Sequence, residues 1–450
     1  MSDNNEINSN YLSTLTKLIE KQNSSKIKKM ISNLHVADIA EIIEYLDTKH
    51  SKYFYNLITS EEILASVLIE LEDDTRKKLL KGLSAKEIAE EVIENLETDD
   101  AVDIIKELTE EKKEKVLSHL EDIKYANDIN DLLSYKLNTA GSLMGKELIK
   151  VNENWHTVQC LKEMRKQANS IKTVYTIYVV DDNDKLLGLM SLRRLLLTER
   201  TAIIKDIMFT DIISIKANDR KEDVANIMQK YDLVALPVVD NNSKLLGRIT
   251  IDDVMDVAKE EAEKNYQMAS GISEDIESSD GLWQLTRARL PWLLIGLLGG
   301  VLGAKTIGFF HIERNFELVL FIPLIAAMGG NVGIQSAAIV VQGLANDSLK
   351  MENASKKLLK ELAVGLLNGI ICSVIILVAT FVLGYNIHLS LAVSISLLVV
   401  IVFAAMFGTF IPLTLERQKI DPALATGPFI TTINDILGLF IYFWIGQLII

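Results

Sequence analysis

The chain has 450 residues, of which 49% are hydrophobic, and its formal net charge at pH 7 is −14. The mean hydropathy of +0.20 conceals a boundary, because charged residues are frequent up to about residue 280 and rare after residue 290, which excludes a wholly soluble protein. The chain has only two cysteines, Cys160 and Cys372, which is too few for a disulfide framework or a thiolate metal site. We expect no nucleic-acid partner.

Residues 1–135 are expected to form a superhelical stack of short amphipathic helices in the cytosol, with residues 1–25 disordered. Ser84 and Glu87 have the spacing of a capping box, and Thr98 and Thr109 each precede acidic residues, as N-caps do. A weak repeat relates DIAEIIEYL (38–46) to DAVDIIKEL (100–108), which is typical of stacked helices.

Residues 136–257 contain a stronger internal repeat, with an offset of 59 residues from Val179 to Val238. VVDDNDKLLGLMSLRRLL in the first copy aligns without gaps to VVDNNSKLLGRITIDDVM in the second. Each copy predicts a β-branched strand, a polar turn, a second strand after Gly188 or Gly247, and a helix. These residues resemble the tandem cystathionine-β-synthase (CBS) pair, which is an α/β regulatory module.

CBS pairs often bind adenosine nucleotides through a Thr or Ser that is followed three residues later by Asp. The second copy has this combination as Thr250 and Asp253, whereas the first copy has Ser191 and Arg194. The carboxylate that would bind the ribose is therefore missing from the first copy. The resemblance makes ATP a candidate ligand at Thr250 and Asp253.

Residues 258–285 are expected to form a connecting helix. Between Asp252 and Asp280 the chain has ten acidic residues and two basic ones, Lys259 and Lys264. Packing like charges together destabilises a compact state, and a divalent cation relieves the repulsion. A solvated acidic helix would have the same composition, so both interpretations stay open.

Residues 286–450 contain five apolar runs, each long enough to cross a hydrocarbon core of roughly 30 Å. Five such runs in succession predict an all-α membrane domain of five transmembrane helices rather than buried helices of a soluble core. The expected spans are 291–310, 318–342, 362–384, 389–415 and 423–450.

The basic residues around the short loops predict the orientation, because positively charged loops stay on the cytosolic side. We therefore expect a multi-pass protein of the plasma (cell) membrane with a cytosolic N-terminus and an external C-terminus. The polar start of the chain, MSDNNEINSN, does not resemble a signal peptide. One side of the membrane has Arg287, Arg289, Lys350, Lys356, Lys357, Lys360, Arg417 and Lys419, and the opposite loops have Arg314.

One acidic residue, Asp435, lies well inside an expected span, where a charge costs roughly 2.5 to 3.5 kcal/mol. Thr431, Thr432, Gly427 and Gly438 share its helical face, and this narrow polar stripe suits a pore wall. A buried ion pair explains Asp435 less well, because no span has a basic residue at that depth. We expect Asp435 to bind the transported cation.

The second span contributes Asn331 and Gln335, which lie one helical turn apart in IAAMGGNVGIQSAA (325–338). Small residues let helices approach closely, and glycines let the backbone open where carbonyls line a wet cavity. The same residues would also form a helix-packing seam, and both roles are compatible. Together with Asp435, these oxygen ligands favour a hard divalent cation such as Mg²⁺.

Two stretches of the membrane half are distinctive, FIPLIAAMGGNVGIQSA (321–337) and DPALATGPFITTINDILGLFIYF (421–443). With these stretches and the order of helix stack, CBS pair, connecting helix and five spans, the sequence resembles the MgtE family of bacterial magnesium channels over essentially its whole length. The resemblance implies a homodimer in the lipid bilayer, with a pore on the symmetry axis where two copies of Asp435 bind Mg²⁺. It also implies a cytosolic region that binds Mg²⁺ and then closes the pore through the connecting helix.

The expected function is therefore Mg²⁺ transport, with regulation by Mg²⁺ and with ATP as a candidate ligand. Where the family commonly has an acidic pair in the connecting helix, this chain has Lys264 and Asn265, so we expect Mg²⁺-dependent closing to be weakened. The expected metal ligands are Asp435, Asn331 and Thr431 in the membrane domain and, by family correspondence, Asp99, Asp103, Glu222, Asp232, Asp253, Asp256 and Glu261 in the cytosolic region.

Other function classes fit the sequence less well. A membrane metalloprotease needs a motif such as HExxH, and none of the six histidines lies at the centre of a span, so we expect no enzymatic activity. An ion-coupled secondary transporter of Mg²⁺ or Co²⁺ is the main alternative, because one acid in mid-membrane can serve a channel or a carrier. A membrane-tethered sensor would leave Asp435 without a role.

Overall fold

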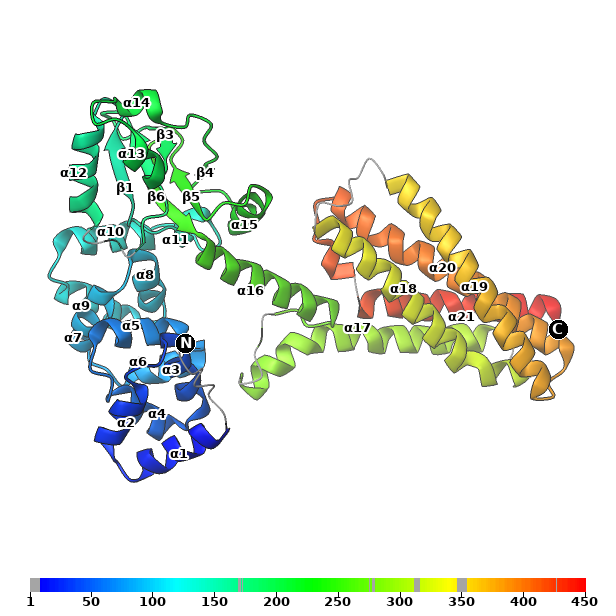
Figure 1. Cartoon of the computed structure of the whole chain (residues 1–450). Coiled ribbons are helices and arrows are strands. Elements are labelled where there is room, and N and C mark those ends of the chain that lie inside the picture. The colour runs from blue at the N-terminus through cyan, green and yellow to red at the C-terminus, as the bar shows by residue number, and fades with distance from the viewer. Residues whose placement is uncertain are drawn as a thin grey trace. The chain divides into compact units, whose positions relative to one another are not determined.

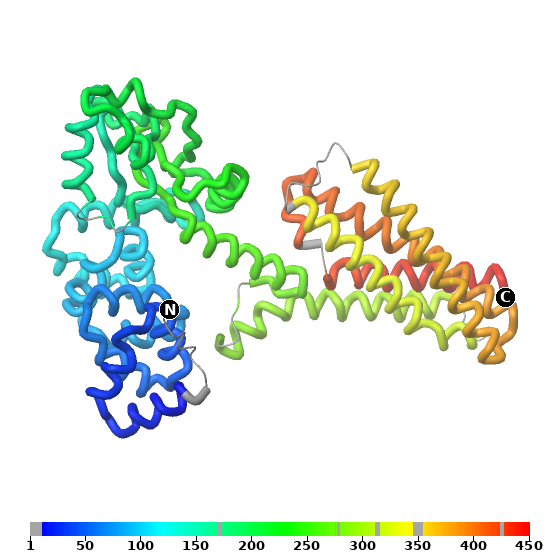
Figure 2. Tube along the Cα trace, viewed as in Figure 1, coloured from blue at the N-terminus to red at the C-terminus, as the bar shows by residue number. Residues whose placement is uncertain are grey.

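The computed structural model divides the chain into two compact units, Met1–Lys259 and Glu260–Ile450 (Figure 1, Figure 2). Arg314 and Lys350, which entered the orientation argument, lie outside the described residues. The structure describes residues 9–168, 171, 173–274, 276, 280–310, 316–345, 354–425 and 427–450.

The first part of unit one is a stack of short helices, as the amphipathic pattern predicted. Leu15 and Ile19 of its first helix are buried, so the expected disorder of residues 1–25 is wrong for Ser9–Glu20. The helices are α1 (Ser9–Glu20), α2 (Ser24–Ile31), α3 (Val36–Tyr45), α4 (Thr48–Tyr55), α5 (Glu61–Glu70), α6 (Asp73–Lys81), α7 (Ala85–Glu87), the π-helical turn η1 (Ile88–Val92), the 3₁₀ turn η2 (Ile93–Asn95), α8 (Thr98–Lys106), α9 (Glu110–His119) and α10 (Ile123–Leu133).

The predicted capping box at Ser84 and Glu87 is confirmed. The Glu87 backbone N–H donates to the Ser84 hydroxyl at 3.2 Å, and the Ser84 N–H donates to the Glu87 carboxylate at 2.7 Å. The expected cap at Thr98 is wrong, because Glu97 occupies the N-cap and Thr98 begins α8. Thr109 is the N-cap of α9, although its side chain forms no capping hydrogen bond in the described chain.

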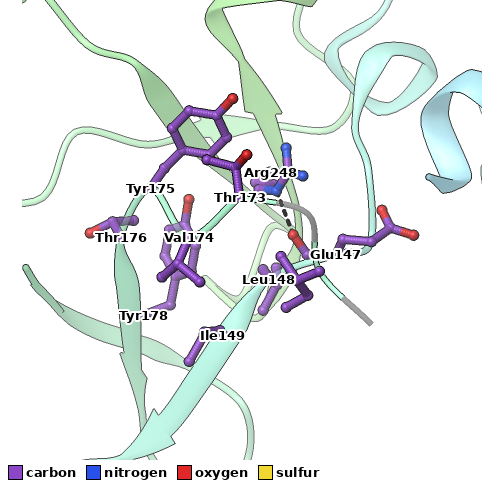
Figure 3. Close-up of a pocket in the computed structure, with 10 residues that line it drawn as sticks. Glu147, Leu148, Ile149, Thr173, Val174, Tyr175, Thr176, Tyr178 and Arg248 are labelled. Carbon is purple, nitrogen blue, oxygen red and sulfur yellow. Dashed lines mark hydrogen bonds between the residues drawn. The ribbon is translucent and has the colours of Figure 1, made fainter. Parts of the chain in front are cut away.

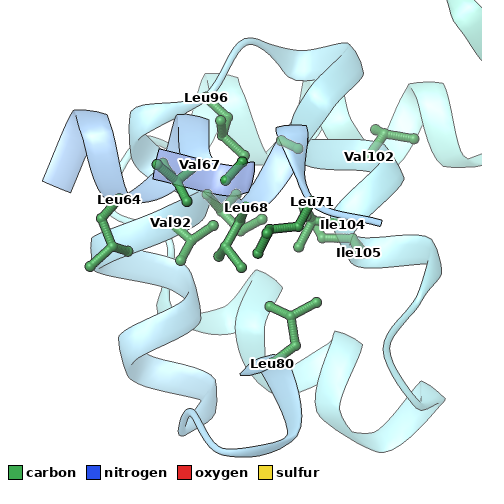
Figure 4. Packing of buried hydrophobic residues seen from close by; sticks show 14 of the residues in the cluster. Leu64, Val67, Leu68, Leu71, Leu80, Val92, Leu96, Val102, Ile104 and Ile105 are labelled. Carbon is green, nitrogen blue, oxygen red and sulfur yellow. The ribbon is translucent and has the colours of Figure 1, made fainter. Parts of the chain in front are cut away.

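Apolar side chains fill the centre of the helical stack (Figure 4). The repeated sequences place equivalent residues there, since Ile42 and Ile43 of α3 and Ile104 and Ile105 of α8 are all buried. Burying one such side chain contributes roughly 1.5 to 3 kcal/mol. The weak repeat therefore marks two helices that use the same face for packing.

The CBS pair consists of two three-stranded sheets in which β1 and β2, or β4 and β5, run parallel and the third strand runs antiparallel. Gly188 and Gly247 lie inside the third strands rather than before them, opposite Val179 and Val238. The elements are α11 (Ala140–Leu143), β1 (Ile149–Asn152), α12 (Thr157–Gln167), β2 (Ile177–Val180), β3 (Leu186–Met190), α13 (Leu192–Leu197), α14 (Ile204–Ile207), β4 (Ile215–Lys216), α15 (Lys221–Lys230), β5 (Ala235–Val239) and β6 (Leu245–Thr250).

The helical stack and the second CBS copy share one hydrophobic core. Leu96, Ile105 and Leu132 of the stack belong to the same buried cluster as Leu236 and Ile249 of the second sheet. This shared core joins the helical stack to the second CBS copy, and Glu97 at the N-cap of α8 pairs with Arg248 of β6.

A long helix, α16 (Ile251–Ala269), follows β6 directly. The predicted bounds of the connecting helix, 258–285, are wrong at both ends, because the helix starts inside the second CBS repeat and ends at Ala269. After it, the backbone N–H of Ser273 donates to the carbonyl of Ala288 at 2.9 Å, which ties the following segment to the first membrane helix.

The second unit is helical, and five helices in its described part are long and apolar enough to cross a membrane, as predicted. α20 is extensively buried and packs against α18, α19 and α21. The third span starts earlier than expected, so Lys357 and Glu361 belong to a helix rather than to a loop. The helices are α17 (Leu282–Phe309), α18 (Ile322–Ala345) after a 3₁₀ turn η5 (Phe316–Phe321), α19 (Ala354–Val382), α20 (Ile387–Arg417) and, after a 3₁₀ turn η7 (Pro422–Ala425), α21 (Pro428–Ile449).

Candidate functional site

Asp435 lies two turns into α21 and is half-buried. The helix begins at Gly427, whose φ of +60° and ψ of −125° suit glycine, and Pro428 at the first helical position has no N–H to leave unpaired. A β-carbon on Gly427 would stand 2.5 Å from the carbonyl oxygen of Ala269 at the end of α16. The start of the helix that carries Asp435 is therefore in close contact with the end of the connecting helix.

Two threonines one turn before Asp435 contact glycines of neighbouring helices. A β-carbon on Gly299 of α17 would lie 2.0 Å from Thr432 Cγ2, and one on Gly330 of α18 would lie 3.5 Å from Thr431 Cγ2. The Thr431 hydroxyl donates to the carbonyl of Pro428 at 3.0 Å, which leaves its lone pairs available. The Asp435 face of α21 thus lies beside glycine surfaces of α17 and α18.

Asn331 and Gln335 are exposed on α18, and Gln342 continues the same stripe. Successive residues of a helix are about 100° apart, so this stripe lies opposite the buried positions Gly329 and Gly333. We call Asn331, Gln335 and Gln342 the amide face of α18. Amide groups exposed on a span need a partner or water.

Asn434 is a residue of this region that sequence reasoning missed. Its side chain is 2% exposed, and its Nδ2 donates to the carbonyl of Gly329 at 3.2 Å. Within the described part of the chain its Oδ1 has no hydrogen-bond partner. The available signal was its position directly before Asp435, which directs it to the neighbouring helix instead of the Asp435 face.

Asp435 forms no ion pair with any described residue. A carboxylate inside a span, with the Thr431 hydroxyl one turn away on the same helical face, can attract a cation and hold it through its waters. The structure therefore brings Asp435 and Thr431 to one face of α21, and places Asn331 on the adjoining helix α18.

A second set of carboxylates lies in unit one, where α8 meets the CBS pair. Glu97, Asp99 and Glu147 each offer one oxygen within 4.8 Å of the others, a geometry that can hold a metal ion. Thr98 fixes Glu147, because its N–H and its hydroxyl donate to the two carboxylate oxygens, both at 2.9 Å. Of these acids, sequence reasoning had identified Asp99 alone.

Arg248 of β6 is the cation of this cluster, and it is 3% exposed. Its Nη2 donates to Glu97 Oε2 at 2.7 Å, and its Nε donates to the backbone carbonyl of Glu147. The Gly145 and Arg248 backbones also bond to each other, at 2.8 and 2.9 Å. One buried arginine therefore links the helical stack to the CBS pair.

Burial and mutual repulsion alter the acidity of the cluster. Burial raises the pKa of Asp99 well above its usual range, and the charge of Asp253 raises it further. Burial raises the pKa of Asp253 to about 6, although hydrogen bonds from Thr250 oppose the shift, and burial also raises the pKa of Glu147. These carboxylates repel one another, so a divalent cation would be favourable among them.

The other predicted cytosolic ligands lie outside this cluster. Asp103 Oδ1 is 2.9 Å from Lys106 Nζ, and Glu222 Oε2 is 3.8 Å from Arg220 Nε. Asp232 is exposed, with φ of +51°, and follows Tyr231, the C-cap of α15. Asp256 and Glu261 are exposed on α16. The structure thus brings Asp99 and Asp253 together, but does not bring these five to the same place.

A small pocket lies in the CBS pair next to Arg248 (Figure 3). Tyr175, Tyr178 and Val174 line it, and the Glu147 side chain points away from it. Thr250 and Asp253 do not line the pocket. The Thr250 hydroxyl donates to Asp253 Oδ2 at 2.8 Å, and the Thr250 backbone N–H donates to the same oxygen at 2.9 Å. This oxygen of Asp253 therefore already accepts two hydrogen bonds from the last residue of β6.

Family models match three successive parts of the chain. The model described as a divalent cation transporter (MgtE) matches residues 322–445, the MgtE intracellular N domain matches 34–138, and the CBS domain matches 140–198 and 204–260. These matches follow the predicted order of helical stack, CBS pair and membrane helices, and they confirm the predicted fold class.

Curated relatives with the name magnesium transporter MgtE resemble most of the chain. The protein of Bacillus subtilis (strain 168) is 30% identical over 421 residues, which cover 93% of each chain. That of Thermus thermophilus is 32% identical over 338 residues, or 74% of this chain and 75% of the relative. A crystal structure of the cytosolic domain of the Mg²⁺ channel MgtE in complex with ATP matches 55% of this chain and 99% of that chain, with 27% identity and a TM-score of 0.51.

Proposed function

Because the chain belongs to the MgtE family of magnesium transporters, we propose that it conducts Mg²⁺ across the plasma membrane through a path lined by α21 and α18. It is a Mg²⁺ transporter with five candidate membrane helices, a cytosolic N-terminal region and a CBS regulatory domain. The C-terminus is proposed to lie outside. The proposal of this ion path rests mainly on Asp435, a half-buried carboxylate inside a candidate span.

The amide face of α18 supports a homodimer. Asn331, Gln335 and Gln342 are exposed in the single chain, and amide groups in contact with lipid would lose their hydrogen bonds. A second protomer on this face would enclose a hydrated path between the two copies. Each copy would then contribute one Asp435 to the ion.

The ligand chemistry supports Mg²⁺ as the cargo. Mg²⁺ takes oxygen ligands, dehydrates reluctantly and usually keeps several waters, so carboxylates in a hydrated path suit it. The membrane potential supplies about 2.3 kcal/mol per charge per 100 mV, which doubles for a dication. Conduction down this gradient needs no further energy source.

Patch recordings separate a channel from the ion-coupled carrier. With Mg²⁺ as the permeant cation, a channel gives discrete unitary currents that scale with voltage. A carrier gives a current below single-molecule resolution that depends on a gradient of the coupling ion. Unitary currents support the proposal, and a strict requirement for a Na⁺ or H⁺ gradient overturns it.

For regulation, we infer that Mg²⁺ binds the cytosolic cluster of Glu97, Asp99, Glu147 and Asp253. Among the described residues, Arg248 is the arginine that faces these four acids, so the cluster retains excess negative charge when they are ionised. Mg²⁺ would hold α8 on the CBS pair. Asp103, Glu222, Asp232, Asp256 and Glu261 are proposed as further regulatory ligands on family correspondence.

ATP binding is proposed on the likeness to the ATP-bound cytosolic domain. The Thr250 and Asp253 pair is present, but Asp253 Oδ2 is engaged by Thr250. Calorimetric titration with ATP tests the proposal, with Asp253→Asn as the variant. Binding that is unchanged in this variant would place the nucleotide elsewhere.

A further inference from the structure

Glu361 is a buried carboxylate in a candidate membrane span that the proposed path does not use. It lies in α19 and is 5% exposed. An ionisable residue at such a position is costly and is retained only where it has partners and a role. Its partners identify that role.

Both oxygens of Glu361 are engaged. The hydroxyl of Ser336 on α18 donates to Oε1 at 2.8 Å, and Nζ of Lys357, one turn earlier on α19, lies 3.8 Å from Oε2. The Lys357 side chain is 15% exposed and the Glu361 side chain 7%, so this ion pair is largely shielded from solvent. The carboxylate therefore links α18 to α19 by a charge-assisted hydrogen bond.

A second contact holds the same face of α18. Asn434 of α21 donates to the carbonyl of Gly329 at 3.2 Å, and a β-carbon on Gly333 would lie 2.0 Å from Asn434 Nδ2. Gly329 and Ser336 are seven residues apart, which is close to two full turns, so they share one face. α18 is thus anchored on this face by α21 at one point and by α19 two turns further on.

The amide face of α18 lies on the side opposite these anchors. Asn331 and Gln335 are about 200° and 240° around the helix axis from Gly329, at about 100° per residue. Anchoring Gly329 and Ser336 fixes the rotation of the helix about its axis. The same contacts therefore fix the direction in which the amide face points.

We propose that Glu361 is a positioning residue for ion passage, which holds the amide face of α18 toward the path through its bond to Ser336. The proposal rests on the proposed function, because that function places the amide face on the path. Glu361 itself does not contact the ion. Its effect is transmitted through the rotation of α18.

Thiol reactivity measures this rotation in the full-length protein. In a background with Cys160 and Cys372 replaced by alanine, Gln335→Cys reports the amide face and Ala337→Cys, at a fully buried position, reports the anchored face. A charged methanethiosulfonate reagent should label the first much faster than the second. Glu361→Ala should reduce the ratio of the two rates about tenfold, as expected from losing one hydrogen bond to a charged group.

Two further variants separate positioning from general stability. Ser336→Ala should change the ratio of labelling rates as Glu361→Ala does. The double variant should have no larger effect, because the two changes remove the same hydrogen bond. Glu361→Gln keeps an acceptor oxygen for Ser336 and should preserve most of the ratio. Variants with a lower ratio of labelling rates should also show lower Mg²⁺ uptake at equal amounts of inserted protein.

An unchanged ratio in inserted Ser336→Ala and Glu361→Ala proteins overturns the positioning role, even where the amount of inserted protein falls. This outcome leaves the path intact, because the path depends on Asp435. Normal Mg²⁺ conduction by Asp435→Asn would instead overturn the path, whatever the thiol rates are.

Discussion

Gly145 lies so close to Asp99 that a β-carbon on the glycine would stand 2.5 Å from the Asp99 carboxylate oxygen Oδ2. The backbone carbonyl of Gly145 is itself only 2.6 Å from where a β-carbon on Gly247 would be. Two glycines thus let the chain before β1 approach both β6 and the acid of α8. The cytosolic cluster depends on this absence of side chains.

Gly145→Ala should therefore displace Asp99 and reduce Mg²⁺ binding to the cluster. We expect inhibition of uptake by cytosolic Mg²⁺ to weaken, while uptake at low cytosolic Mg²⁺ stays normal, since the path lies in unit two. Flux into proteoliposomes at graded Mg²⁺ measures both. Gly281→Ala is the matched control, because a β-carbon there meets open space. Full inhibition in Gly145→Ala would contradict the role of the cluster.

Mg²⁺ affinity of the cytosolic cluster should depend on pH, because ligands must be deprotonated to bind a metal. Burial raises the pKa of Asp253 to about 6, so this carboxylate is charged at pH 7 and mostly protonated at pH 5. We expect affinity to weaken about tenfold over this interval. Calorimetry on residues 1–259 measures it, and Asp253→Asn should reduce the dependence without abolishing it, because burial also raises the pKa of Asp99 and Glu147.

Without a divalent cation, the stability of the same fragment should change in the opposite sense. The folded state binds the proton of Asp253 more tightly than the unfolded state, whose pKa is near the ordinary 3.8. The free energy of unfolding should therefore fall as pH rises from about 4 to 6 and then level off. A flat profile across this window would mean that Asp253 is not buried beside other acids.

Arg248→Met should destabilise unit one strongly. The change removes the ion pair of Arg248 with Glu97 in a largely buried site, and breaking such a pair costs about 3 kcal/mol or more. Arg194→Met is the matched control in the other CBS copy, where the guanidinium lies 4.2 Å from the ring centroid of Phe209, a contact worth about 1 kcal/mol. Urea unfolding of residues 1–259 compares the two. Added Mg²⁺ should restore part of the unfolding free energy that Arg248→Met loses. Equal losses of unfolding free energy in the two variants would contradict the account.

Local and periodic features were predictable from the sequence. Five spans followed from hydropathy, because each expected span is a long apolar run with at most one charged residue, and the CBS sheets followed from a gapless repeat. Asp435 was identified because a charge inside an apolar helix is rare. The helix ends were less accurate, since α16 begins at Ile251 where the pattern of a CBS repeat continues into a helix.

Long-range pairing was not predictable from the sequence. Glu97 and Arg248 are 151 residues apart, and nothing in either local sequence identifies the other. The lone arginine in LLGRIT of β6 signals that an acidic partner exists, but not which one. Glu361 fell just outside the expected third span, 362–384, although α19 already begins at Ala354.

The direction in which the amide face of α18 points could also not be predicted from the sequence. Both faces of α18 are rich in small residues, so hydropathy does not reveal which face is buried. The contacts of Gly329 and Ser336 with neighbouring helices settle this point.

The central claim is that cations pass beside Asp435, and recordings from membrane patches with Mg²⁺ as the permeant cation test it most directly. Asp435→Asn should be inserted normally but carry no Mg²⁺ current, because the variant loses the carboxylate that attracts the ion. Glu317→Gln is the matched control, since it neutralises an exposed acid at the start of the second span and should leave the current unchanged. Wild-type Mg²⁺ currents in correctly inserted Asp435→Asn protein would contradict the account.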